Sequence, residues 1–126
     1  MVEAPRFVLF EPFGSSAPFE TWIMPRQTQP SFRDATDADV DALAPVLRAV
    51  LASLAEAQGD PDYNAILQSA PVGDEHRKYF VSHLRIVPRL AIAAAFELGS
   101  GMPVNPSRPE DTAATLRPFV RRELQS

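Results

Sequence analysis

The longest helical pattern in the chain is TDADVDALAPVLRAVLASLAEAQGDP, residues 36–61. Thr36 is a suitable N-cap, and acidic residues follow it in the first turn, where the helix dipole favours them. Gly59 can adopt the left-handed conformation that ends a helix, so the helix should stop near it. Pro45 lies inside the pattern and predicts a kink or a restart. The apolar stripe of this helix recurs at three- and four-residue steps and consists of Val40, Leu43, Leu47, Val50, Leu51 and Leu54.

Short apolar segments on both sides of this helix predict β-strands. Residues 7–10 and 20–24 precede the helix, and residues 63–68 and 79–87 follow it. The sequence does not decide whether residues 91–98 form a helix or a strand. Their alanines favour a helix, whereas Phe96 and the glycines that follow favour a strand that enters a loop.

A second helix is expected at the C-terminus. Pro109 suits a first helical turn, and Glu110 and Asp111 add acidic side chains beside it. Pro118 interrupts the middle of this pattern. The apolar stripe consists of Ala113, Leu116, Val120 and Leu124. Strands interleaved with one long helix and followed by a terminal helix predict an α+β domain with a mostly antiparallel sheet.

The segment of residues 79–87 would place its side chains alternately on two faces of the sheet. Leu84 and Ile86 share one face, and His83 and Arg85 share the other. A neutral, oriented imidazole can act as a nucleophile, and a guanidinium group can neutralise a phosphate. His83 and Arg85 are therefore candidate catalytic residues. The alternative for His83 is an imidazole that simply packs within the sheet.

Composition limits the class of protein. The chain has 126 residues, 45% of them hydrophobic, and a formal net charge of -4, which fits a single domain at residues 1–126 and argues against nucleic-acid binding. No segment is apolar enough for a membrane span or a signal peptide, so we expect no membrane partner and a cytoplasmic location. There are no cysteines, and His76 and His83 are the only histidines. We interpret His76 as an exposed loop residue.

Several segments, in one order and with similar gaps, carry a family resemblance. They are residues 18–25 (PFETWIMP), 62–64 (DYN), 86–90 (IVPRL) and 96–101 (FELGSG), with Asn105-Pro106 and Pro109-Glu110 after them. From about residue 7 to residue 116, the chain resembles the histidine-triad (HIT) superfamily. Within it, the likeness is to the C-terminal half of galactose-1-phosphate uridylyltransferase and related nucleotide-sugar phosphorylases.

This resemblance implies a HIT-like fold, in which the long helix packs on a meander sheet and the domain usually pairs with a second copy. The full transferases contain two such halves in one chain, and only the N-terminal half carries the nucleophilic histidine. The chain therefore looks like a free-standing C-terminal half. A homodimer, or a separate catalytic partner chain, is the partner that the resemblance implies.

The resemblance also indicates where site residues should lie. The superfamily has histidines at three alternate strand positions, which here read Val81, His83 and Arg85. His83 would occupy the position that attacks the α-phosphorus of a nucleotide. The transferase half commonly holds a metal through histidines on this strand and after the proline-basic segment, where this chain has Thr28 or Gln27. One imidazole is too few for zinc or iron, so we expect neither a metal nor a cofactor.

Four residues are candidate substrate ligands. In the related enzymes the matching segment contacts the hexose or its phosphate, often across a subunit interface. A carboxylate and an amide can bridge sugar hydroxyls, and glycines let backbone donors approach closely. The alternative is a turn that needs glycine beside an exposed glutamate. The four residues are Phe96, Glu97, Gly101 and Asn105.

Aromatic residues gather early in the chain, at Phe10, Phe13, Phe19 and Trp22. We favour a core or a dimer surface for them over a base-stacking platform.

Three functions stay open at this point. The favoured hypothesis is a HIT-like domain that is non-catalytic alone, binds a sugar phosphate or nucleotide sugar, and pairs with itself or with a catalytic partner. The alternative is a reduced nucleotidyltransferase or nucleotide hydrolase, similar to hexose-1-phosphate uridylyltransferase. In that case His83 forms a nucleotidyl intermediate and Arg85 stands in for a lost histidine. The third option is a structural dimer without a ligand.

Overall fold

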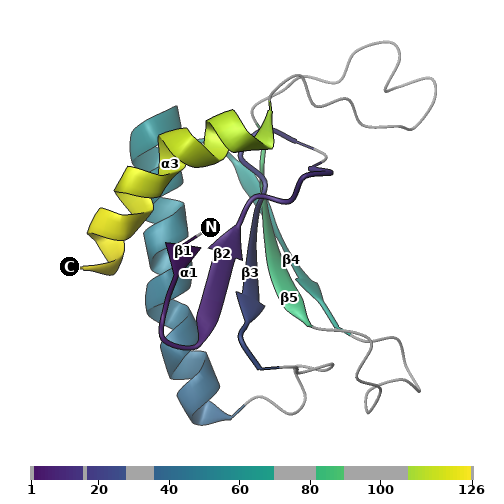
Figure 1. Ribbon diagram of the computed structural model, residues 1–126, viewed down its shortest axis with the longest axis vertical. Coiled ribbons are helices and arrows are strands. Elements are labelled where there is room, and N and C mark those ends of the chain that lie inside the picture. The colour runs from purple at the N-terminus through teal and green to yellow at the C-terminus, as the bar shows by residue number, and fades with distance from the viewer. Residues whose placement is uncertain (1, 16, 28–35, 70–81, 90–107, 126) are drawn as a thin grey trace.

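The computed structural model describes residues 2–15, 17–27, 36–69, 82–89 and 108–125. The described strands form one antiparallel sheet in the order β1-β2-β3-β5-β4, so β5 lies between β3 and β4 (Figure 1). This confirms the α+β class, the antiparallel sheet, the long helix and the terminal helix. The elements are β1 (Val2–Glu3), β2 (Phe7–Phe10), β3 (Thr21–Pro25), α1 (Asp37–Gln58), β4 (Tyr63–Gln68), β5 (His83–Pro88) and α3 (Pro109–Leu124).

The hydrophobic core lies between one face of the sheet and the helices α1 and α3. Figure 1 shows α1 and α3 on the same side of the sheet. Alternate strand residues point toward them, as the buried side chains of Leu9, Ile23 and Ile86 illustrate. The helices contribute Val46, Val50, Leu54, Leu116 and Val120 to this core. Neither of these helices covers the opposite face of the sheet (Figure 1).

The ends of α1 follow the sequence closely. The Thr36 hydroxyl accepts a hydrogen bond from the backbone N–H of Asp39, and the Asp39 carboxylate accepts one from the Thr36 N–H. These bonds hold the pKa of Asp39 below its usual value, with help from Arg6. Gly59 ends the helix in the left-handed region, at φ 76°. The predicted N-cap and stop are both confirmed.

Two proline expectations were wrong in part. Helix α1 continues through Pro45 without a restart, and α3 continues through Pro118. Both prolines lie on exposed positions of their helices, where water can reach the carbonyl that loses its hydrogen bond. Buried residues hold each helix in the core: they begin at Val46, directly after Pro45, and in α3 they lie on both sides of Pro118. Val40, predicted as the first residue of the α1 stripe, is 58% exposed because the core begins further along the helix.

Strand β4 forms an exposed edge of the sheet. It pairs with β5 alone, and five of its six residues are exposed, including Tyr63, Ile66 and Leu67. No described element covers it on its outer side. The strand was predicted correctly at residues 63–68, but its lack of burial was not.

Some predictions fall outside the described residues. These are the strand residues 79–81, the ambiguous segment 91–98, His76 and Thr28. Strand β1 was not predicted at all, since a two-residue strand has no periodicity to detect.

Candidate functional site

The face of the sheet opposite the helices carries the candidate site. Strand pairing places Phe10, Trp22, Arg85 and Ile66 side by side across β2, β3, β5 and β4. His83 is two residues from Arg85 and therefore lies on the same face, as the sequence predicted. Residues from three strands thus meet around the indole of Trp22.

The imidazole of His83 stacks on the indole of Trp22. The two ring centroids are 4.3 Å apart and the ring planes differ by only 14°. Phe10, which pairs with Trp22 from β2, packs against the indole in a tilted arrangement with ring centroids 5.8 Å apart. His83 is 8% exposed, so most of its surface is covered. The stacked geometry agrees with a packed imidazole and also fixes the plane of the ring for any chemistry at its nitrogens.

Glu20 binds both Trp22 and Arg85. The indole Nε1 of Trp22 donates to Glu20 Oε2 at 3.2 Å, and Arg85 Nη2 donates to Glu20 Oε1 at 3.0 Å. The Arg85 guanidinium lies 5.7 Å from the centroid of the Trp22 ring, within cation–π range. The Nε of Arg85 is buried and has no hydrogen-bond partner within the described ranges. The guanidinium of Arg85 is therefore already bound to other residues of the chain, through Nη2 to Glu20 and through its contact with the Trp22 ring.

Sequence reasoning predicted the pairing of His83 and Arg85 on one face but missed Glu20. A usable signal existed, because Glu20, directly before β3, is two residues from Trp22 and so points to the same face of the sheet as Trp22 and its strand partner Arg85. Phe96, Glu97, Gly101 and Asn105 lie outside the described residues. Their role as substrate ligands stays a prediction.

The site residues do not fit the metal that the resemblance implied. Arg85 stands at one of the strand positions expected for a ligand, and a guanidinium has no lone pair to donate. Across the described segments, no group of three or more His, Cys, Asp or Glu side chains could hold a metal ion. Gln27, the described residue at the alternative ligand position, is exposed.

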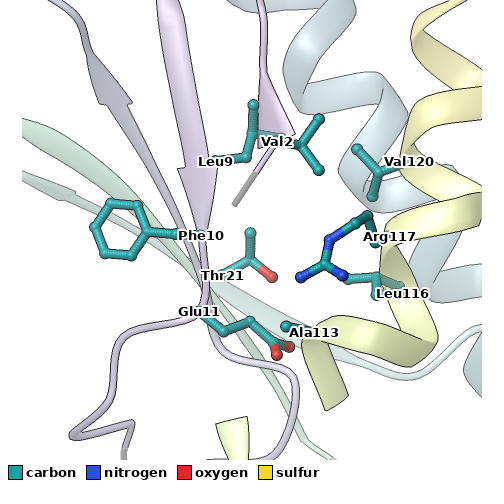
Figure 2. A pocket seen from close by; sticks show the side chains of 9 residues that line it. All are labelled: Val2, Leu9, Phe10, Glu11, Thr21, Ala113, Leu116, Arg117 and Val120. Atoms are coloured by element: carbon teal, nitrogen blue, oxygen red, sulfur yellow. The ribbon is translucent and has the colours of Figure 1, made fainter. Parts of the chain in front are cut away.

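A second polar feature lies between β2 and α3. Glu11 follows β2, and its Oε2 accepts a 2.7 Å hydrogen bond from the Thr112 hydroxyl, while its Oε1 is buried without a hydrogen-bond partner among the described residues. Burial raises the pKa of Glu11 to about 7, although Thr112, the chain's amino group and Arg117 all act to lower it. Figure 2 shows Arg117 directed into the adjoining cavity of about 30 Å³, which Leu9 and Leu116 also line. That volume suits a single water molecule.

Known proteins share this fold, and some of them share about a quarter to a third of the aligned residues. An ADP-glucose phosphorylase from Arabidopsis thaliana is 34% identical over 117 residues, which cover 91% of this chain and 33% of that protein. Its crystal structure with bound ADP-glucose superposes on this chain with a TM-score of 0.85. A uridylyltransferase structure gives a TM-score of 0.84 at 26% identity, over 96% of this chain and 40% of the other.

A smaller protein extends the likeness to the superfamily. A zinc-bound histidine-triad family protein from Mycobacterium smegmatis has a TM-score of 0.69 at 19% identity, with 96% of this chain and 82% of that one covered, and this likeness concerns the fold alone. No protein-family model matches the chain.

The fold is therefore HIT-like, as the sequence predicted. More specifically, the chain corresponds to a half-size domain of the proteins that resemble galactose-1-phosphate uridylyltransferase, among them ADP-glucose phosphorylase. It spans about a third of the length of the curated relative that it matches. Within the described residues, no helix is both long enough and apolar enough to cross a lipid bilayer.

Proposed function

We propose that the chain is a HIT-like binding domain, residues 1–126, that is non-catalytic alone and recognises a sugar phosphate or nucleotide sugar. The observation that carries this proposal is the 34% identity over 117 residues to a phosphorylase whose crystal structure holds ADP-glucose. His83 supports the non-catalytic part, because a single stacked imidazole stands where catalytic members of the superfamily have three. A cytoplasmic location is part of the same proposal.

The proposed ligand contacts extend beyond His83. Phe96, Glu97, Gly101 and Asn105 belong to the segment whose counterpart in the related enzymes contacts the sugar or its phosphate. A carboxylate and an amide suit sugar hydroxyls because each can bridge two of them. The competing explanation is a glycine-dependent turn with an exposed glutamate, so Glu97 is the residue to test.

A thermal-unfolding titration tests the ligand. Hexose 1-phosphates, UDP-sugars, ADP-sugars and plain nucleotides are added in turn to the wild type and to the His83→Ala and Glu97→Ala variants. A ligand at about 100 times its Kd adds about 2.7 kcal/mol to the free energy of unfolding, and a domain of this size then melts several degrees higher.

The expected result is a shift with the sugar-bearing ligands that Glu97→Ala removes. Glu3→Ala is the matched control, because Glu3 is an exposed glutamate whose only described ion pair is with Arg26. If no ligand class shifts the midpoint, or if Glu3→Ala removes the shift as completely as Glu97→Ala, the proposed sugar site is wrong.

The proposal also includes pairing through the β4 edge, with a second copy of the chain or with a catalytic partner. An unpaired edge strand with exposed apolar side chains is a template for another strand. Leu67 is 53% exposed at this edge. The relatives are longer chains, of which this chain covers 33–42% in the matches above 25% identity, so they contain further structure that such a partner could replace.

Sedimentation velocity tests the pairing. We expect a dimer that Leu67→Lys dissociates and that Val40→Lys leaves intact, since Val40 is an equally exposed apolar residue on the first turn of α1. A wild-type protein that stays monomeric at high concentration contradicts self-pairing. It would leave a catalytic partner chain as the proposed occupant.

A second candidate function follows from His83 and Arg85 on one face of β5. A His83 nitrogen would attack the α-phosphorus of a nucleotide sugar, the bond to the sugar phosphate would break, and the sugar phosphate would leave. The nucleotidyl group would then pass to another phosphate or to water. Incubation with nucleotide sugar labelled at the α-phosphorus tests it: a covalent adduct that is absent from His83→Ala supports a nucleotidyltransferase, and no adduct excludes this alternative.

A further inference from the structure

Glu20 is the most deeply buried ionisable side chain in the described part of the chain, at 2% exposure. An isolated carboxylate at such a depth is costly unless it is paired and hydrogen-bonded. Its two oxygens are engaged separately, Oε1 by Arg85 of β5 and Oε2 by the indole N–H of Trp22 of β3. One carboxylate therefore joins the two central residues of the site face.

The backbone before Glu20 is strained. Phe19 has φ 63°, in the left-handed region that large side chains rarely adopt. Its carbonyl accepts a 3.1 Å hydrogen bond from the Thr21 hydroxyl, and the Glu20 N–H donates to the Ala17 carbonyl at 3.3 Å. Strain of this kind persists where the surrounding structure over-determines the conformation. Here the strained residue immediately precedes the buried carboxylate.

We infer that Glu20 and Arg85 are positioning residues, whose ion pair fixes the indole of Trp22 and, through the stack, the ring of His83. The chain of contacts is continuous: Glu20 binds Trp22 Nε1, and the Trp22 ring lies 4.3 Å from the His83 ring. Arg85 supplies the permanent positive charge that Glu20 needs at this depth. This role goes beyond the proposed function, because it holds whichever ligand the site binds.

The inference also explains why the metal implied by the resemblance does not fit. Arg85 takes a strand position expected for a ligating histidine, and its guanidinium points at the buried carboxylate instead. The ion pair joins the residue that precedes β3 to β5 and orients His83 without a metal ion. The predicted phosphate-neutralising role of Arg85 differs from this one, since the Nη2 group is already bound to Glu20.

The fluorescence of Trp22 tests the inference, because it is the only tryptophan in the chain. An imidazole stacked on an indole quenches its emission, so His83→Ala should raise the emission and define the unstacked level. Arg85→Met and Glu20→Gln should raise it toward that level, and Arg85→Lys should give an intermediate value because it keeps the charge. Arg26→Met is the matched control, since it removes an exposed arginine–glutamate pair on the same sheet and should leave the emission unchanged.

Far-UV circular dichroism shows which variants are folded at the temperature of measurement. If Glu20→Gln does not fold, Arg85→Met and Arg85→Lys decide, because the Arg85 side chain is 24% exposed and tolerates change better. Unchanged emission in the folded Arg85 variants, or in His83→Ala, overturns the inference. Stoichiometric zinc or iron in the purified protein, with a chelator changing Trp22 emission, overturns it as well. We expect neither metal nor any chelator effect.

Discussion

A half-buried and a buried glutamate, Glu11 and Glu20, flank the β2–β3 connection and show two ways of placing a carboxylate inside a small domain. Glu20 faces the site side of the sheet and is bound by a guanidinium and an indole N–H. Glu11 faces α3, where a threonine hydroxyl binds one oxygen, and the other is buried with no partner in the described part of the chain. The first carboxylate has a cation in direct contact, and the second is bound by a neutral donor, so burial raises the pKa of Glu11 to about 7.

The largest loss of stability is expected when Glu20 loses its cation, Arg85. Arg85→Met leaves the Glu20 carboxylate buried without its charge partner, and we expect a loss of about 3 kcal/mol in the free energy of unfolding. Urea unfolding measures this loss. The double variant Glu20→Leu, Arg85→Met should recover much of it, because no buried charge then remains. A loss below about 1 kcal/mol would mean that the pair behaves as an exposed ion pair does.

Glu11 should make stability fall as pH rises. Its pKa is about 7 in the folded chain and 4.5 as the ordinary value, so the folded protein holds this proton more tightly. The resulting stabilisation is complete below pH 4.5 and disappears as pH rises through about 7. Because the residue is only partly buried, we expect a change of about 1–2 kcal/mol.

Unfolding of wild type and Glu11→Gln at pH values from 4.5 to 8 measures this change. The difference between the two proteins isolates Glu11, since every other ionisable group is common to both. The glutamine is neutral at every pH and should show no corresponding decline. Parallel pH profiles for the two proteins would contradict the raised pKa.

Thr112→Val tests the contrast between the two glutamates by removing the hydroxyl that donates to Glu11. Its hydroxyl is 2.7 Å from the carboxylate and lowers the pKa of Glu11, so its loss should raise that pKa further. We expect a loss of about 1 kcal/mol at pH 5 and a larger one at pH 8, where the carboxylate is charged. Thr115→Val is a suitable control, because Thr115 is exposed and its hydroxyl donates to the Asp111 carbonyl of the same helix and not to Glu11. An equal loss at both pH values would show that the hydroxyl does not favour the charged form.

The smallest effect is expected where an ion pair is exposed. Arg26 and Glu3 lie 3.3 Å apart, with side chains 42% and 59% exposed. Glu3→Gln removes the charge attraction and leaves the Arg26 bond to the Ala4 carbonyl in place. The expected loss is about 0.5 kcal/mol or less in urea unfolding. If Glu3→Gln lowered the free energy of unfolding as much as Arg85→Met does, burial would not explain why the Glu20–Arg85 pair contributes more than the Glu3–Arg26 pair.

Much of the fold could be predicted from the sequence because the signals are local. Thr36 and Gly59 cap a helix through their own side chain and backbone freedom, and the strands at residues 7–10 and 63–68 were placed correctly. The alternation on β5 was enough to put His83 and Arg85 on one face. The uninterrupted course of α1 past Pro45 was not predictable in this way, because packing against the sheet compensates for the lost hydrogen bond.

The sequence alone therefore determined the helix ends, the strand segments and the HIT-like class. Only the tertiary structure decided which side chain binds each of the two glutamates. Glu20 and Arg85 are 65 residues apart in the chain, and Glu11 and Thr112 are 101 apart. No local periodicity links such positions, because strand register and helix docking bring them together only when the whole core is formed. Nothing in the sequence distinguishes Glu20 from Glu11. In the fold, Glu20 binds Arg85 and Trp22, whereas the surroundings of Glu11 raise its pKa so that it binds a proton more tightly.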